Sequence, residues 1–263
     1  MSSASDSEWM YGMHAVMGLL KSDPGRVQEI RLLAQRRDQR VDKLRALAEL
    51  QGVPWQWANR TELDRLAPGR HQGVAALCRA GPLRDENYLL ELVAKRRDPL
   101  FLVLDGITDP HNLGACLRVA DAAGVAAVIA PRDRAVGITA SVQKVASGAA
   151  ATVPYVVVTN LARLLRKLRD AGVWVVGTSG DAETCLYAAD LRGPLALVMG
   201  AEETGMRRLT RESCDLAVQL PMQGAVESLN VSVAAGICLF EAQRQRRAAA
   251  APAVGGECGA AAR

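Results

Sequence analysis

The strongest constraint on the fold is a regular alternation of short apolar runs with helical stretches between residues 99 and 247. Continuous apolar runs of this length are typical of parallel strands that are covered by helices on both faces of a sheet. We therefore predict an α/β fold with a mostly parallel sheet over these residues. The predicted strands are LFLVL, AAVIA, VPYVVV, VWVVG, LALVM and DLAVQL, and the predicted helices span 113–123, 139–149, 160–171 and 229–247.

The first third of the chain predicts a second, smaller α/β domain. A charged stretch with a short amphipathic segment at 88–94 separates the two patterns, and we interpret it as a linker. Both ends are polar or low in complexity, which predicts disordered tails. The small domain alternates helices at 11–21, at 41–51 and after Thr61 with strands at 27–34, 53–58 and 74–78. The predicted organisation is a tail at 1–8, domains at 9–79 and 99–247, a linker at 80–98, and a tail at 248–263.

Composition excludes several classes of protein. Hydrophobic residues make up 49% and charged residues 23% of the chain, which is ordinary globular usage and excludes collagen-like, coiled-coil and disordered chains. The net charge of +4 is too small to indicate nucleic-acid binding by itself. The six cysteines form no CxxC pair and have no histidine at metal-ligand spacing, so we expect reduced thiols and no metal site. We find no signal peptide or membrane span and expect a cytoplasmic protein.

Four glycine-containing loops follow predicted strands, at residues 105–114, 177–180, 200–205 and 221–224. Ligands of open parallel sheets bind beyond the carboxyl ends of the strands, so these loops are the candidate site. Glycine there permits a close approach of the backbone to a ligand. Neither GxGxxG nor GxxxxGK[ST] occurs, which weakens the case for a dinucleotide or P-loop site.

Several polar side chains lie on or beside these loops. Asn112 is a predicted cap of the helix that follows it, and Arg118 lies about 100° from that helix's packing stripe, within reach of the same edge. Glu202 either contacts a ligand or caps a helix. Ser228 is a predicted cap of the last helix, and Asn230 lies in its first turn. From spacing alone, ordinary caps and a solvated arginine also account for these residues.

Three segments together resemble the motifs of the SPOUT superfamily of methyltransferases, in its 2′-O-ribose branch called the SpoU or TrmH family. They are DGITDPHNLGACLRVADAAG, LALVMGAEETGM and LPMQGAVESLNVSVAAGICLFEAQR. Upstream, YGMHAVMGLL and HQGVAAL resemble the start and end of a substrate-binding domain similar to L30e-type RNA binders. The resemblance spans residues 9–247. It departs from the family's pattern at Glu203 and Thr204, where related enzymes often carry Gly-Glu or a similar pair.

The resemblance implies a C-terminal trefoil knot, which physical patterns alone would not suggest because true knots are nearly absent from proteins. It also implies a homodimer with its active site near the subunit interface. The implied activity is S-adenosylmethionine-dependent 2′-O-ribose methylation of a guanosine in 23S rRNA. The alternatives are methylation of tRNA or of another rRNA site, and a non-catalytic RNA-binding protein of ribosome assembly.

Residue by residue, the resemblance assigns the cofactor pocket to Gly200, Leu220, Met222 and Leu229. It assigns the polar active-site positions to Asn112, Arg118, Glu202, Ser228 and Asn230. An arginine costs about 7 kcal/mol to deprotonate at pH 7, so we interpret Arg118 as a phosphate clamp and not as the general base. The base stays unassigned: His111 has the more suitable chemistry, but local hydrogen bonds would also explain a histidine in this loop.

The first domain carries a candidate RNA-binding face. Residues 26–45 contain seven basic and three acidic side chains, and Arg36, Arg37 and Arg40 are the predicted phosphate contacts. A solvated helix surface is the alternative interpretation. Trp55 and Trp57 share one face of a predicted strand, and we expect core packing rather than base stacking for them.

Overall fold

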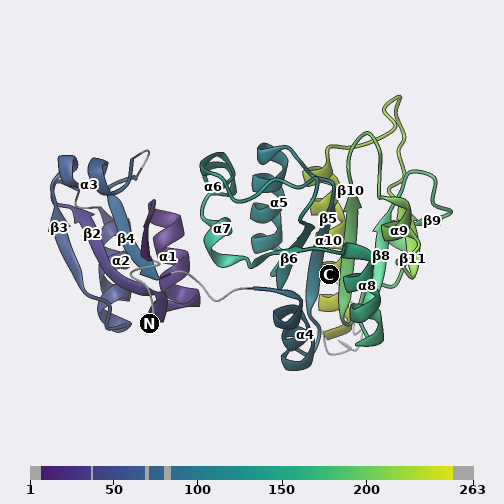
Figure 1. Ribbon diagram of the computed structural model, residues 1–263, viewed down its shortest axis with the longest axis horizontal. Helices are drawn as coiled ribbons and strands as arrows, with labels where there is room; N and C mark the ends of the chain where they lie inside the picture. Colours follow the sequence, from purple (N-terminus) through teal and green to yellow (C-terminus); the bar gives the residue numbers. More distant parts are fainter. Residues whose placement is uncertain (1–6, 37, 69–70, 80–83, 251–263) are drawn as a thin grey trace, which may run out of the picture.

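Two separate sheets organise the chain, as Figure 1 shows from the purple N-terminal part to the yellow C-terminal helix. The computed structural model describes residues 7–36, 38–68, 71–79 and 84–250. The first part of the chain forms a four-stranded sheet, and the second part forms a seven-stranded sheet. The predicted α/β class, with a small unit followed by a larger one, is confirmed.

The small unit has the strand order β1-β4-β2-β3, in which only β2 and β3 run parallel. Its strands are β1 (Ser7–Tyr11), β2 (Val27–Leu33), β3 (Trp55–Ala58) and β4 (Val74–Arg79), and its helices are α1 (Met13–Ser22), α2 (Gln39–Leu50) and α3 (Arg60–Leu66), with a 3₁₀ turn at Pro24–Arg26. Sequence analysis missed β1, whose first residues fall in the predicted tail. Ser7 and Glu8 are ordered because they pair with Arg79 and Cys78 of β4.

The expectation for the two tryptophans is confirmed for only one of them. Trp55 packs partly buried against the core beneath α2. Trp57, on the edge strand β3, is 39% exposed. The two rings stack edge to face with their centroids 5.2 Å apart.

The large sheet has the strand order β7-β6-β5-β10-β8-β11-β9, and all of its paired strands are parallel, as predicted. Its strands are β5 (Leu100–Asp105), β6 (Ala127–Pro131), β7 (Tyr155–Val158), β8 (Trp174–Thr178), β9 (Thr184–Cys185), β10 (Leu195–Gly200) and β11 (Leu216–Gln219). Neighbouring side chains of β5 serve opposite faces: Leu102 packs in one core cluster and Val103 in the other. This double coverage explains the continuous apolar runs.

Helices cover both faces of this sheet. One face carries α5 (Pro110–Ala122), α6 (Ala140–Ala146), α7 (Ala149–Thr152) and α10 (Val231–Ala250); the other carries α4 (Glu86–Lys95) and α8 (Leu161–Asp170), with α9 (Arg208–Arg211) beside α8. The helix predicted at 139–149 is broken, because Ser147 and Gly148 adopt left-handed φ angles of 51° and 100°. Within the predicted linker, α4 buries Leu89 and Leu92 in the core of the large unit. The last helix extends to Ala250, into the predicted tail, whose remaining residues lie outside the described ranges.

The two units meet where α1 lies against α7 (Figure 1). A Cβ atom at Gly18 would lie 2.5 Å from Cγ2 of Thr152, and one at Gly148 would lie 2.9 Å from the carbonyl carbon of His14. The Thr152 hydroxyl donates a 2.6 Å hydrogen bond to Asp121 of α5. The contact therefore requires glycine at both positions. Through the hydrogen bond of Thr152 it is also connected to α5, the helix that follows β5.

The trefoil knot concerns the threading of the loops, and it stays a prediction. Among the helices of the described ranges, none combines the length and hydropathy that crossing a bilayer requires.

Candidate active site

The carboxyl ends of four neighbouring strands meet at one edge of the large sheet. β5, β10, β8 and β11 are adjacent and parallel, so the loops that leave them lie side by side. The register places Gly200, the last residue of β10, opposite Asp105, the last residue of β5. The loops selected from the sequence therefore do converge at one edge.

The turn after β10 is closed by two backbone hydrogen bonds. The Ala201 N–H donates to the Gly205 carbonyl at 3.1 Å, and the Gly205 N–H donates back to Ala201 at 2.8 Å. A Cβ atom at Gly200 would lie 2.2 Å from the carbonyl carbon of Gly205, so no side chain fits there. Gly205 itself has a φ of 63°. This tight turn places Glu202 on the exposed rim of the edge.

Glu202 joins the three motifs through a single carboxylate oxygen. Its Oε1 atom accepts hydrogen bonds from Asn230 Nδ2 at 2.8 Å, from the Val231 backbone N–H at 3.1 Å and from Asn112 Nδ2 at 3.2 Å. Asn230 Nδ2 also lies 2.8 Å from Asn112 Oδ1. Asn112 and Asn230 are 118 residues apart in the sequence and in direct contact in the fold. We call Asn112, Glu202 and Asn230 the polar cluster.

The start of α5 differs from the prediction. Asp109, not Asn112, is the N-cap: its carboxylate accepts hydrogen bonds from the backbone N–H groups of His111 and Asn112, each at 3.1 Å. Pro110 occupies the first helical position, where its fixed φ and missing N–H are tolerated. The helix therefore begins three residues earlier than expected, and the Asn112 side chain is available to Glu202.

The start of α10 also differs from the prediction. Asn230 Oδ1 accepts hydrogen bonds from the Ser232 N–H at 3.0 Å and from the Ser232 hydroxyl at 2.6 Å, so Asn230 caps the helix. The predicted cap, Ser228, lies exposed in the loop before it. Glu202 accepts the Val231 N–H of the same helix end, so it both caps a helix and belongs to the polar cluster.

Arg118 does not join the polar cluster within this chain. It is exposed on α5, and the structure gives it no hydrogen bond or ion pair among the described residues. The packing stripe beside it is as predicted, with Leu113, Leu117 and Ala120 buried. His111 is exposed next to Asn112.

The positions that the resemblance assigns to the cofactor pocket lie at or beyond the carboxyl ends of β10 and β11. Gly200 ends β10, and Leu220, Met222 and Leu229 lie on the loop that leads from β11 to α10. All four are half-buried, whereas most of the intervening loop residues are exposed. The structure therefore brings these positions to the same edge as the polar cluster.

Sequence analysis missed an ion pair between two of the motif loops. The Asp105 carboxylate accepts the Arg207 backbone N–H at 2.9 Å and the Arg207 side-chain Nε–H at 2.7 Å. The side chain of Asp105 is fully buried. The sequence feature that could have indicated this ion pair is the charged residue Asp105 directly at the end of an apolar strand run. The pair fixes the turn after β10 against the end of β5.

The predicted RNA contacts on the first unit have different surroundings. Arg36 forms a 2.6 Å ion pair with Asp38 and donates to the carbonyl of Gln72, so it already holds two loops together. Arg40 is exposed at the start of α2. Arg37 lies outside the described residues.

Two buried cysteine thiols, Cys116 and Cys238, lie on α5 and α10, the helices that begin at this edge. Burial, and to a smaller extent the Glu202 carboxylate, raises the pKa of Cys116 to about 12. Burial also raises the pKa of Cys238 to about 12. In the described part of the chain, no group of three His, Cys, Asp or Glu side chains is arranged to hold a metal ion.

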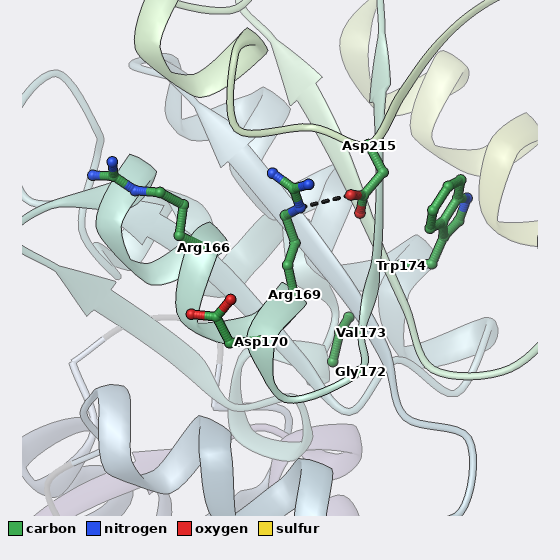
Figure 2. A pocket seen from close by; sticks show the side chains of 7 residues that line it. All are labelled: Arg166, Arg169, Asp170, Gly172, Val173, Trp174 and Asp215. Atoms are coloured by element: carbon green, nitrogen blue, oxygen red, sulfur yellow. Dashed lines mark ion pairs between the residues drawn. The ribbon is translucent and has the colours of Figure 1, made fainter.

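A surface hollow of about 560 Å³ lies away from this edge, at the amino end of β8 (Figure 2). Arg169 and Asp215 form a 2.6 Å ion pair within it. None of the predicted site residues lines the hollow, whose lining is Arg166, Arg169, Asp170, Gly172, Val173, Trp174 and Asp215.

Comparisons with known proteins agree with this architecture. The model of the SpoU rRNA Methylase family matches residues 99–240, and that of the RNA 2′-O ribose methyltransferase substrate-binding domain matches residues 9–82. The 23S rRNA (guanosine-2′-O-)-methyltransferase RlmB of Shewanella oneidensis is 56% identical over 90% of this chain and 97% of its own. RlmB of Escherichia coli is 55% identical over 91% of this chain and 99% of its own.

Solved structures show the same fold. The crystal structure of an RNA 2′-O ribose methyltransferase has a TM-score of 0.68 at 26% identity and covers 91% of this chain and 88% of its own. The SpoU methyltransferase AviRb from Streptomyces viridochromogenes, in complex with AdoMet, has a TM-score of 0.71 at 24% identity and covers 92% and 91%. With its motif loops joined at one sheet edge and close relatives along nearly its whole length, the chain belongs to the SpoU rRNA methylase family.

Proposed function

We propose that this protein transfers a methyl group from S-adenosylmethionine to the ribose 2′-hydroxyl of a guanosine in 23S rRNA. The observation that carries the proposal is the polar cluster, in which Glu202 holds residues of all three motifs together at the carboxyl edge of the sheet. The similarity to the RlmB methyltransferases over nine-tenths of the chain supports the substrate class.

The residues beside the cluster suit the cofactor. Leu220, Met222 and Leu229 are half-buried and offer apolar contact to an adenosyl group, while the turn after Gly200 offers backbone polar groups. When bound, S-adenosylmethionine supplies an electrophilic methyl group on a positively charged sulfonium. AviRb, a neighbour in fold, is described in complex with this molecule, which supports the same pocket here.

The chain's own groups position the acceptor. Asn112, Asn230 and Ser228 offer amide and hydroxyl groups that orient the ribose, because methyl transfer needs the hydroxyl oxygen in line with the leaving sulfur. Arg118 binds the adjacent phosphate through its guanidinium group. His111, exposed beside Asn112, is the candidate to accept the hydroxyl proton, since a neutral imidazole carries a ring nitrogen that can accept a proton.

We further propose a homodimer that forms through α10. Val233 and Phe240 are 51% and 49% exposed, and with the half-buried Ile237 they form an apolar stripe at helical spacing. Gly236 on the same helix lies against Val119 of α5, the residue next to Arg118. In this dimer, a second copy packed on the stripe brings Arg118 close to the partner's polar cluster. This arrangement would explain why Arg118 has no hydrogen bond or ion pair among the described residues of its own chain.

The first unit binds the RNA in this proposal. Its match to a substrate-binding domain supports the role, and of the two predicted phosphate contacts that the structure describes, Arg40 is the more exposed. Arg36 contributes less, because Asp38 engages its Nε and the Gln72 carbonyl engages its Nη1. We place the enzyme in the cytoplasm, where ribosomal RNA is modified in bacteria.

The test is a methylation assay with labelled S-adenosylmethionine on transcripts of 23S rRNA and on total tRNA. We expect label in 23S rRNA, and at least a hundredfold slower turnover for Arg118→Ala. Arg166→Ala, on the exposed face of α8, is the matched control and should retain the wild-type rate. Label in tRNA alone would favour the alternative substrate, and no detectable binding of S-adenosylmethionine by calorimetry would favour a non-catalytic RNA-binding protein. Full turnover by Arg118→Ala would remove that residue from the catalytic set.

A further inference from the structure

The ion pair between Asp105 and Arg207 presents a guanidinium group at the edge of the sheet. The Asp105 side chain has no exposed surface, whereas that of Arg207 is 41% exposed. A buried carboxylate without a cation would be strongly destabilising, so Asp105 holds Arg207 in place. Two hydrogen bonds, from the backbone N–H and from Nε, fix where the Arg207 side chain leaves the turn.

Most of the hydrogen-bonding capacity of Arg207 stays available. A guanidinium carries five N–H donors, and the Nε–H is the one that Asp105 uses. Among the described residues, the structure gives no acceptor to Nη1 or Nη2 of Arg207. The neighbouring arginines differ, because Arg208 pairs with Glu212 at 2.7 Å and Arg211 pairs with Asp181 at 2.9 Å.

We propose that Arg207 binds a backbone phosphate of the RNA substrate and that Asp105 orients it for this contact. The chemistry fits, because a guanidinium held at Nε presents a planar pair of amino groups that matches two phosphate oxygens. The inference rests on the proposed function, which supplies the RNA at this edge. Arg207 is then a substrate-binding residue, and Asp105 is a positioning residue.

The position of the Asp105–Arg207 pair indicates which way a bound RNA runs across the edge of the sheet. Side chains alternate along β5, and Val103 faces the layer of α4 and α8, so Asp105 faces the same layer. The polar cluster instead joins the starts of α5 and α10, which cover the opposite face. A phosphate on Arg207 therefore makes the RNA cross the edge of the sheet from one helical layer to the other.

The experiment measures the salt dependence of RNA binding by the full-length protein. A 23S rRNA fragment, labelled with a fluorophore, is titrated by anisotropy at several KCl concentrations. Loss of one phosphate contact lowers the slope of log K against log salt by about 0.7 to 0.9. We expect this decrease for Arg207→Gln and an unchanged slope for the control Arg208→Gln, which removes the same charge one residue away. Arg207→Lys keeps the charge but loses the planar pair, so its slope should be close to wild type and its affinity for RNA lower.

The outcomes separate this inference from the proposed function. A wild-type slope for Arg207→Gln would overturn the phosphate contact, even if the wild-type protein methylates rRNA normally. A lowered slope in a protein that methylates no RNA would support the contact and refute the methyl transfer. If Arg207→Gln does not fold, Arg207→Lys decides, and wild-type affinity for RNA in that variant would overturn the role of the planar pair.

Discussion

Replacing Glu202 tests whether the polar cluster depends on hydrogen-bond geometry or on charge. One oxygen of Glu202 accepts three N–H groups, so Glu202→Ala leaves all three without this acceptor. The Val231 N–H belongs to a helix cap, worth about 1 kcal/mol. The two asparagine amides are exposed and can bind water, so each contributes about 0.5 kcal/mol. We expect Glu202→Ala to lower the free energy of unfolding by about 2 kcal/mol.

Glu202→Gln provides the comparison, because a glutamine oxygen can accept the same three N–H groups. It loses only the attraction between a carboxylate and the positive end of α10, worth about 0.5 kcal/mol at an exposed site. For a chain of this length, about 3 °C per kcal/mol gives a decrease in melting temperature of about 6 °C for alanine and about 2 °C for glutamine. We expect kcat to fall further for alanine, because Asn112 and Asn230 lose the acceptor that they share.

The assays are urea unfolding followed by circular dichroism and methyl transfer with labelled cofactor. Glu203→Ala is the control, because it removes the neighbouring exposed carboxylate, for which the structure gives no hydrogen bond among the described residues. Equal losses for alanine and glutamine would show that charge dominates and would refute the geometric argument. An alanine variant as stable and active as wild type would show that the cluster contributes nothing.

Three further predictions address the turn, the dimer and the thiols. Gly200→Ala should lower the free energy of unfolding by about 2 kcal/mol, because the new Cβ atom would lie 2.2 Å from the backbone of the turn. Gly224→Ala is the control: nothing lies within 4 Å of its Cβ position, so the free energy of unfolding should change by less than about 0.5 kcal/mol in the same urea titration. Phe240→Ser should give the mass of one chain, 28.0 kDa, in light scattering, where the wild type gives twice that; a monomeric wild type would contradict the interface. With pKa values of about 12, Cys116 and Cys238 of the folded protein should be alkylated at pH 8 about a thousandfold more slowly than in urea. The alkylation rate should rise about tenfold for each unit of pH. Fast labelling of the folded protein would contradict the burial of these thiols.

The sequence was sufficient for the parallel sheet and for the edge at which the motif loops converge, because strands buried on both faces leave continuous apolar runs. It was less reliable for the boundaries of elements. The start of α5 depends on Asp109 and Pro110 acting together, and Asn112 is an equally good cap by type. The break after α6 depends on the left-handed conformation of Ser147, which nothing in the local residue types requires.

The contacts among the predicted site residues could not be predicted from the sequence. The family motifs indicate Asn112, Glu202 and Asn230, but only the folded chain shows that one oxygen of Glu202 serves the others, since these contacts span 28 to 118 residues. Asp105 was read as the start of a loop, because its partner Arg207 lies 102 residues away. The predicted knot and the proposed dimer concern the threading of loops and a second chain, which residue patterns do not encode.

The distance between the two sheets depends on two glycines in the contact of α1 with α7. Gly148 lies against the backbone of His14 and Gly18 lies against the side chain of Thr152, so a larger residue at either position would push the two helices apart. A small tilt at this contact is magnified across the width of the first unit. Under the proposed function, Gly18 and Gly148 would thus set the distance that a bound RNA spans between the two units.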